Sequence, residues 1–226
     1  MNNDTPGLPW LQVPKSAQVR RILERYLVEV VERHELCPWA RATRQHGELA
    51  IGILWGTPSL EAWVAEAARL LAAPAARVVA PAARVVMVVA PELVIAREAF
   101  GALRDRVAAR IPSAGVAEFH PGATLDRTTP ARLVPFLRRS PDPLLQLVPL
   151  AQLDAVRAVP PAPLLAQQAA MLGGHAAPPR AALATRIAAD NHATIARAHA
   201  EIVATLDAIA ADRAASYACV GITASR

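Results

Sequence analysis

The chain has 226 residues, a length that suits one large domain or a domain with an appendage and that allows a substantial core. Hydrophobic residues make up 54% of the sequence, which excludes an intrinsically disordered chain. The formal net charge of +5 comes almost wholly from arginine, because Lys15 is the only lysine. No dense basic run interleaved with aromatic residues occurs, so we expect no nucleic-acid partner.

The N-terminal stretch MNNDTPGLPW lacks the basic and apolar regions of a signal peptide. Apolar runs such as VVMVVA are too short to span a bilayer, so we expect no membrane association. The only two cysteines, Cys37 and Cys219, form no CxxC pair. Such sparse cysteine usage in a chain of this length indicates a reducing compartment, and we expect a cytoplasmic protein.

The first part of the chain predicts an irregular arm followed by helix, strand and helix. Three prolines mark residues 1–15 as the arm. Apolar residues at helical spacing predict a helix over 16–36, which Pro38 ends because proline disfavours helical backbone in the preceding residue. The stretch ELAIGILW predicts a strand over 48–55, and a helix over 60–72 follows.

The middle of the chain contains a perfect tandem copy, because APAARVV occurs at 73–79 and again at 80–86. No further copies follow, so we interpret it as a duplication and expect its second copy to lead into a strand. A continuous apolar run over 84–90 is typical of a central strand that is covered on both faces. A helix over 92–110 and a strand over 116–120 complete this part.

The last part predicts a strand over 144–148 and a short helix over 150–158. Proline and glycine mark 159–180 as a connection around a short helical piece. A long helix over 181–213 then carries a widely spaced apolar stripe, within a C-terminal segment that runs to 226. This helix either packs back on the core or supports a homodimer interface.

Together these elements predict an α+β fold, in which residues 16–158 form the core domain and 181–226 pack on it as a helix and tail. The order of helices and strands favours a two-layer α/β sandwich with a sheet of about four strands. A ferredoxin-like arrangement is one candidate.

Three short motifs place polar residues where the predicted elements end. LCPWA follows the first helix with Cys37, FHP ends a strand with His120, and RRSPDP leads into the next strand with Arg138, Arg139 and Ser140. Strand ends and the loops after them are where α/β folds place ligands. The flanking prolines would fix the direction of the backbone there.

In the functional interpretation, Cys37 supplies a thiolate, His120 a base or proton donor, and Arg139 a clamp for an anion. Arginines recur from residue 127 to residue 139 without an acid among them, and a guanidinium offers a bidentate fork to a carboxylate or phosphate. In the alternative interpretation, Cys37 only packs, His120 satisfies a loop carbonyl, and Arg139 pairs with a surface acid.

A metal or haem interpretation has less support. His34 and Cys37 at H-x-x-C spacing could share one ion with His120, but zinc sites normally show a second close pair, which the sequence lacks. A cysteine before a proline could also present an axial thiolate to haem. The sequence therefore assigns no metal site and leaves the cofactor open.

The same motifs, in the same order, resemble domain of unknown function family 1415, a family of uncharacterised bacterial proteins. Its pattern has LCPFA after the first helix, FHP at a strand end and N-R-S-P-x-P-x-x-H-L-L-R after a gap. Thr128 resembles the threonine of a T-x-P between the last two motifs, and Asn191 and Thr194 resemble residues of the last helix. This chain departs from the pattern at Gln146, where the family has histidine, and at Pro149, where it has arginine. The resemblance implies a shared site but no reaction.

The leading hypothesis is therefore a cytoplasmic enzyme that acts on a small anionic molecule. Its site residues fall into two groups. We expect catalysis from Cys37 and His120, and substrate binding from Arg139, Ser140, Arg138, Thr128 and Gln146. The competing hypothesis is a non-catalytic module that binds a small ligand or a protein partner and carries a degenerate site.

Overall fold

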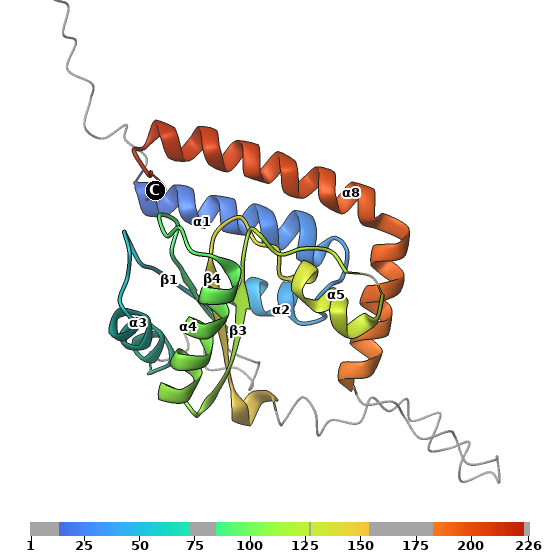
Figure 1. Cartoon of the computed structure of the whole chain (residues 1–226), viewed down its shortest axis with the longest axis horizontal. Coiled ribbons are helices and arrows are strands. Elements are labelled where there is room, and N and C mark those ends of the chain that lie inside the picture. Colours follow the sequence, from blue (N-terminus) through green and yellow to red (C-terminus); the bar gives the residue numbers. More distant parts are fainter. Residues whose placement is uncertain (1–13, 73–84, 127, 154–182, 224–226) are drawn as a thin grey trace, which may run out of the picture.

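A computed structural model describes residues 14–72, 85–126, 128–153 and 183–223 (Figure 1). The fold is mixed α/β, with one four-stranded sheet and a long C-terminal helix, as the sequence predicts. In chain order the elements are α1 (Lys15–Tyr26), η2 (Leu27–Glu32), α2 (Ala40–Gln45), β1 (Leu49–Ile53), α3 (Leu60–Ala72), β2 (Val85–Val89), α4 (Arg97–Arg110), β3 (Ala114–Phe119), α5 (Pro130–Leu137), β4 (Leu144–Pro149) and α8 (Leu183–Cys219).

The sheet is mixed and has the strand order β1-β2-β4-β3. Strands β1 and β2 pair in parallel, with Ile51 opposite Met87. Strand β4 lies antiparallel to both of its neighbours, with Gln146 opposite Met87 on β2 and Ala117 on β3. Strands β1, β2 and β3 therefore end at the same edge of the sheet, where β4 begins. This edge carries the FHP and RRSPDP motifs.

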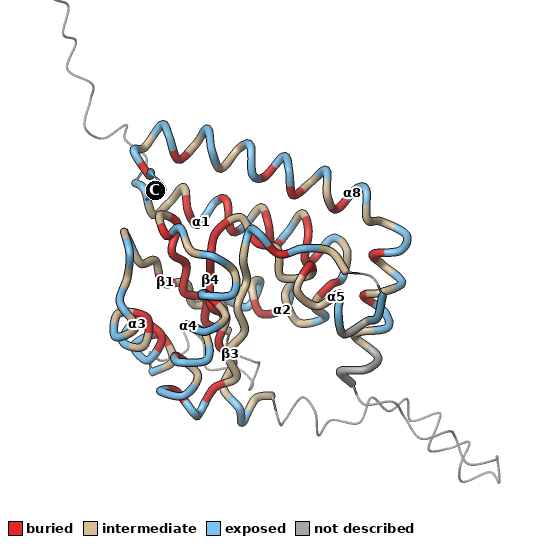
Figure 2. Tube along the Cα trace, viewed as in Figure 1, coloured by how far each residue is buried: buried red, intermediate tan, exposed pale blue. Residues whose placement is uncertain are grey.

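Helices cover both faces of the sheet, so a third layer is present in addition to the two that we expected. One core contains Met87 and Leu144 and is closed by α1, η2, α5 and α8. The other contains Val88 and Leu145 and is closed by α3 and α4. Neighbouring strand residues point to opposite faces. The residues of β2 and, apart from Gln146, those of β4 are apolar, so each face needs a cover. Strand β2 is buried from Val86 to Val89, and β4, part of which is coloured as buried in Figure 2, is buried at Leu144, Leu145 and Leu147.

The predicted first helix begins as α1 and continues as η2, a π-helical stretch. Its wider hydrogen-bond pattern includes the amides of Arg33 and Leu36, which donate to carbonyls five residues earlier. π-Helical turns are rare and are frequently found at functional sites. Glu35, which follows η2, has a positive φ of 53° and turns the chain into the LCPWA motif.

Helix α5 was not predicted, because two prolines fall within its eight residues. Pro130 occupies the first turn, where a missing N–H costs nothing, and the Thr129 hydroxyl accepts a hydrogen bond from the amide of Arg132 at 3.2 Å. Pro135 lies inside the helix, close to its end. Helix α4 begins at Arg97 instead of residue 92, because Pro91 is followed by a turn.

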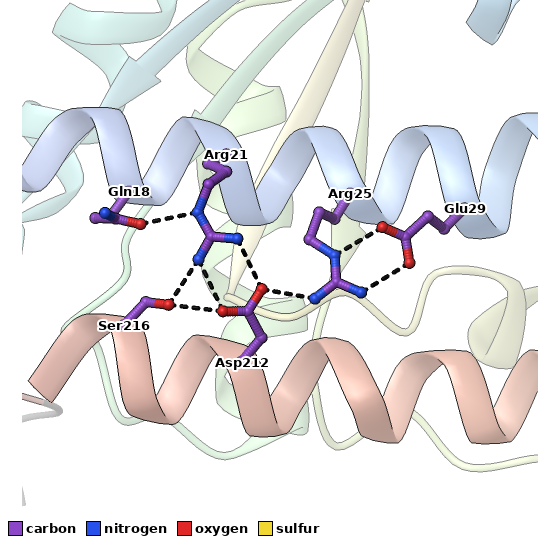
Figure 3. Close-up of polar contacts among 6 residues, drawn as sticks. All are labelled: Gln18, Arg21, Arg25, Glu29, Asp212 and Ser216. Carbon is purple, nitrogen blue, oxygen red and sulfur yellow. Dashed lines mark hydrogen bonds and ion pairs between the residues drawn. The ribbon is translucent and has the colours of Figure 1, made fainter.

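Helix α8 lies along α1, as Figure 1 shows, and buries Ile195, Ile202 and Ile209. An ion-pair cluster joins the two helices (Figure 3). The carboxylate of Asp212 accepts hydrogen bonds from Arg21 at 2.7 and 2.8 Å and from Arg25 at 2.6 Å. Other members of this α1–α8 cluster are Gln18, Glu29 and Ser216.

Several expected segments lie outside the described residues. These are the arm as far as residue 13, most of the duplicated stretch, and the connection over 159–180. Residues 150–153 are helical, and the rest of the helix expected over 150–158 also lies outside the described part. Within the described residues, no helix combines the length and the apolar composition that a membrane crossing requires.

Candidate functional site

The backbone brings two of the three motifs together at the end of the sheet. The amide of His120 donates a hydrogen bond to the carbonyl of Arg138 at 3.0 Å. The FHP motif that follows β3 and the RRSPDP motif that precedes β4 are thus in direct contact. Ligands in α/β folds commonly bind at such strand ends.

The His120 ring is held by hydrogen bonds at both of its nitrogens. Nδ1 accepts from the amide of Gly122 at 3.0 Å, so we assign the ring proton to Nε2, which lies 3.0 Å from the carbonyl of Ile95. The ring also packs at a centroid distance of 5.8 Å from Phe100. A neutral imidazole in this network has no nitrogen available to act as a base, and its role here is to join the loops after β2 and β3.

A small hollow lies beside this ring, with a volume of about 30 Å³. We call it the β3-end cleft. It is lined by Arg97, Glu118, His120, Ala123, Val134, Pro135 and Arg138.

Arg138 enters the cleft from the end of α5. Its guanidinium carbon lies 5.9 Å from the centre of the Phe119 ring, which allows a cation–π contact. Burial lowers the pKa of Arg138, and nearby Glu118 opposes that shift. Even so, arginine stays protonated at physiological pH. The cleft therefore contains a positive charge that is partly removed from water.

Arg97, at the start of α4, supplies a second guanidinium and is not among the predicted site residues. Across the described residues, neither Arg97 nor Arg138 lies within ion-pair distance of a carboxylate. Glu118 Oε2 lies 3.2 Å from Arg104 Nε, within ion-pair distance but without hydrogen-bond geometry. The sequence position of Arg97 could have indicated it. Arg97 follows the apolar strand β2, which ends at the same edge of the sheet as β3. Because the helix was expected to begin at residue 92, Arg97 was placed inside the helix and not at its start.

Cys37 lies on the face of the sheet opposite to the His120 ring. Its side chain packs against the core that contains Tyr26, whereas the His120 ring packs on Phe100 of the opposite core. Burial raises the pKa of the Cys37 thiol, and the backbone amides of Trp39 and Ala40 offset only part of this shift. The structure thus does not bring Cys37 and His120 into contact, and the sulfur is protonated at neutral pH.

The LCPWA motif is fixed by α8 through Asn191, one of the residues behind the family resemblance. The buried Asn191 amide donates to the carbonyl of Leu36 at 3.2 Å. Tyr26, which belongs to the core that Cys37 packs against, donates a hydrogen bond from its hydroxyl to the carbonyl of Leu137 at 3.3 Å, one residue before the RRSPDP motif.

Arg139 and Ser140 are not part of the lining of the β3-end cleft. Arg139 reaches α8, where its guanidinium lies 3.7 Å from the carboxylate of the exposed Asp207. The buried Ser140 hydroxyl donates to the carbonyl of Asp142 at 2.5 Å and so fixes the turn before β4. In this structure the two residues shape a loop and contact a helix.

Asp142 is a buried carboxylate that the sequence analysis did not single out. It accepts hydrogen bonds from Arg213 Nε and from the Tyr217 hydroxyl, both at 2.6 Å. Arg213 also donates to the carbonyl of Pro91 at 2.8 Å. Burial raises the pKa of Asp142, and the Arg213 charge opposes the shift. This Asp142 network attaches the end of α8 to the loops at the sheet edge.

Thr128 and Gln146 also lie apart from the cleft lining. The amide and hydroxyl of the exposed Thr128 donate to the carboxylate of Asp126 at 2.9 and 2.6 Å, forming the turn before α5. Gln146 is half-buried in β4 and lies on the sheet face of Leu144, which is the face of Cys37.

A larger groove of about 550 Å³ lies between η2 and α2. Its base is Glu32, whose carboxylate is 4% exposed and accepts two hydrogen bonds from Arg44 at 2.6 and 3.0 Å. Arg33 on its rim pairs with Glu201 at 2.6 Å, and Glu29 pairs with Arg25 at 2.7 Å. Because these charges already pair within the protein, the groove offers less to an ionic ligand than the β3-end cleft does.

No arrangement for a metal ion is evident in the part of the chain that the structure describes: no three side chains of His, Cys, Asp or Glu are grouped to hold one. His34 is half-buried against α8, near Glu201 and Arg197, and His120 lies on the other side of the sheet from Cys37.

Comparison with known proteins identifies no relative of this chain. No family model, no curated protein and no solved structure matches the chain. The resemblance to domain of unknown function family 1415 stays a prediction from the three motifs.

Proposed function

We propose that the protein binds a small anionic molecule in the β3-end cleft and that Arg97 and Arg138 hold the anion. The observation that carries this proposal is the partly buried guanidinium of Arg138, which lines a hollow and has no carboxylate within ion-pair distance among the described residues. A charge removed from water is costly unless a partner compensates for it, and a bound anion would supply that partner.

The geometry favours binding over catalysis. In the cleft, His120 has both ring nitrogens engaged, and Cys37 is a buried thiol on the other face of the sheet. A nucleophilic cysteine needs a nearby cation or imidazole to form its thiolate. The enzymatic role of Cys37 stays a prediction, and rapid alkylation of this thiol below pH 7 would support it.

The proposal is tested by thermal unfolding and calorimetric titration of the full chain with formate, acetate, inorganic phosphate and sulfate. Sodium chloride at equal ionic strength is the reference. An anion that binds the folded state raises the melting temperature by mass action. We expect at least one anion to do so, and we expect Arg138→Gln to weaken its binding about tenfold or more, since charged hydrogen bonds contribute about 1.5–3 kcal/mol.

Two variants serve as matched controls. Arg139→Gln changes the neighbouring arginine, which meets Asp207, and Arg106→Gln changes an exposed arginine on the same helix as Arg97. Both should bind the anion as the unmodified protein does. Loss of binding in Arg139→Gln but not in Arg138→Gln would instead support the original assignment of Arg139. The absence of binding by every anion would refute the proposal.

A further inference from the structure

The lining of the β3-end cleft also limits which anion fits. We infer that its ligand is a monocarboxylate with a short aliphatic chain, rather than phosphate, sulfate or an α-amino acid. This inference rests on the proposed function and narrows it to one chemical class. Three features of the cleft support it: the balance of charge, the size of the hollow and the apolar wall.

The charged side chains around the cleft have a net positive charge that one negative charge would neutralise. Two guanidinium groups, from Arg97 and Arg138, and one carboxylate, from Glu118, line the cleft. Glu118 lines the cleft, 3.2 Å from Arg104, and the same guanidinium lies 3.2 Å from Asp105. The group therefore carries a net charge of +1. A monoanion neutralises it, whereas a dianion brings an excess charge close to Glu118, which disfavours it.

The hollow suits a flat group with two oxygens. Its volume of about 30 Å³ corresponds to roughly two or three water-sized spheres. A guanidinium fork matches the two coplanar oxygens of a carboxylate. A tetrahedral phosphate or sulfate presents further oxygens that need further donors. His120 cannot supply one, because its Nε2 proton is directed at the carbonyl of Ile95.

The rest of the wall is apolar. Ala123 is buried, and Val134 and Pro135 on α5 are half-buried at the cleft. Pro135 has no backbone N–H to donate. Beyond a carboxylate that is bound at the arginines, the wall of the cleft is apolar. We therefore expect the rest of the ligand to be an aliphatic chain. An α-ammonium group would lie close to the guanidinium groups, and the one carboxylate of the lining is already paired with Arg104.

The test compares formate, butyrate, inorganic phosphate and alanine by calorimetric titration of the full chain at constant ionic strength. We expect butyrate to bind at least tenfold more tightly than phosphate or alanine. Butyrate should also bind more tightly than formate, by up to about fourfold for each methylene that the wall covers, which is the equivalent of about 0.8 kcal/mol.

Two variants separate charge from the wall, and unfolding in urea checks that each is folded. Val134→Thr places a hydroxyl on the wall and should weaken the binding of butyrate more than the binding of formate. Glu118→Gln removes the negative charge of the lining and should strengthen the binding of phosphate relative to that of butyrate. Phosphate or alanine binding as tightly as butyrate in the unmodified protein would overturn the inference, yet leave the proposed function intact if Arg138→Gln abolishes that binding. If no anion binds, the proposed function itself fails.

Discussion

Near the end of α8 three arginines pair with carboxylates, whereas the two arginines that line the β3-end cleft form no ion pair among the described residues. Arg213 contacts the buried Asp142 at 2.6 Å, and Arg21 and Arg25 share Asp212. Arg97 and Arg138 have no such partner among the described residues. The same residue type therefore has two roles in one chain. The paired arginines link helices and loops, whereas under the proposed function Arg97 and Arg138 would be compensated by a bound anion.

Among the variants that test this contrast, Arg213→Gln should lower the free energy of unfolding the most. In Arg213→Gln the carboxylate of Asp142, which is 2% exposed, keeps its burial but loses its cation. Breaking a buried ion pair from one side costs about 3–5 kcal/mol. We expect a loss of about 3 kcal/mol in the free energy of unfolding, measured in urea at pH 7. A loss below about 1 kcal/mol would show that the Asp142 network contributes little to holding α8.

Removal of Asp212 should have a smaller effect, because its ion pairs are partly exposed. We expect Asp212→Asn to lower the free energy of unfolding by about 1 kcal/mol, the upper range for surface ion pairs. Hydrogen bonds from Arg21, Ser216 and Arg25 hold the pKa of Asp212 below its ordinary value.

The pH dependence of this second effect has a defined sign. A carboxylate whose pKa is lower in the folded state stabilises the protein above its unfolded pKa, about 3.9, and loses that contribution as the pH falls through the folded value. The difference between Asp212→Asn and the unmodified protein should therefore be full at pH 6 and shrink below pH 4. Urea unfolding at both pH values measures it, and a difference that grows on acidification would contradict this account.

The smallest expected effect on stability belongs to Arg138. In the absence of an anion, Arg138→Gln removes a partly buried charge that has no carboxylate to leave behind, so the free energy of unfolding should change by less than about 0.5 kcal/mol. Addition of a binding anion should then stabilise the unmodified protein but not the variant. A loss as large as that of Arg213→Gln would mean that Arg138 is a structural arginine and would remove the contrast.

Local patterns in the sequence predicted most of the elements. The apolar runs of β2 and β4 and the amphipathic spacing of α1 identify their structures directly, and α3 has the bounds that were expected. Helix α5 was missed because proline usually breaks helices, although Pro130 and Thr129 together form a good helix start.

The site was harder to predict, because its contacts join residues that are far apart in the chain. His120 bonds to a carbonyl 25 residues away, and Asp142 meets Arg213 and Tyr217 at separations of 71 and 75 residues. Two of the motifs lie at the edge of the sheet where the β3-end cleft is found, but no local pattern indicates whether a given arginine will find a carboxylate. That is why Arg139 was preferred over Arg138, and why Arg97 was not considered.

The π-helical stretch η2 has a consequence for the length of the first helix. A π-helical turn holds one residue more than an α-helical turn, and the bulge absorbs that residue locally. Deleting one residue within Leu27–Glu32 would therefore return the segment to α-helix with both flanks still in phase, so that Arg25 and Leu36 keep their partners on α8. The same deletion within α1 would rotate everything after it by about 100°. Variation in helix length among related chains should therefore concentrate in η2.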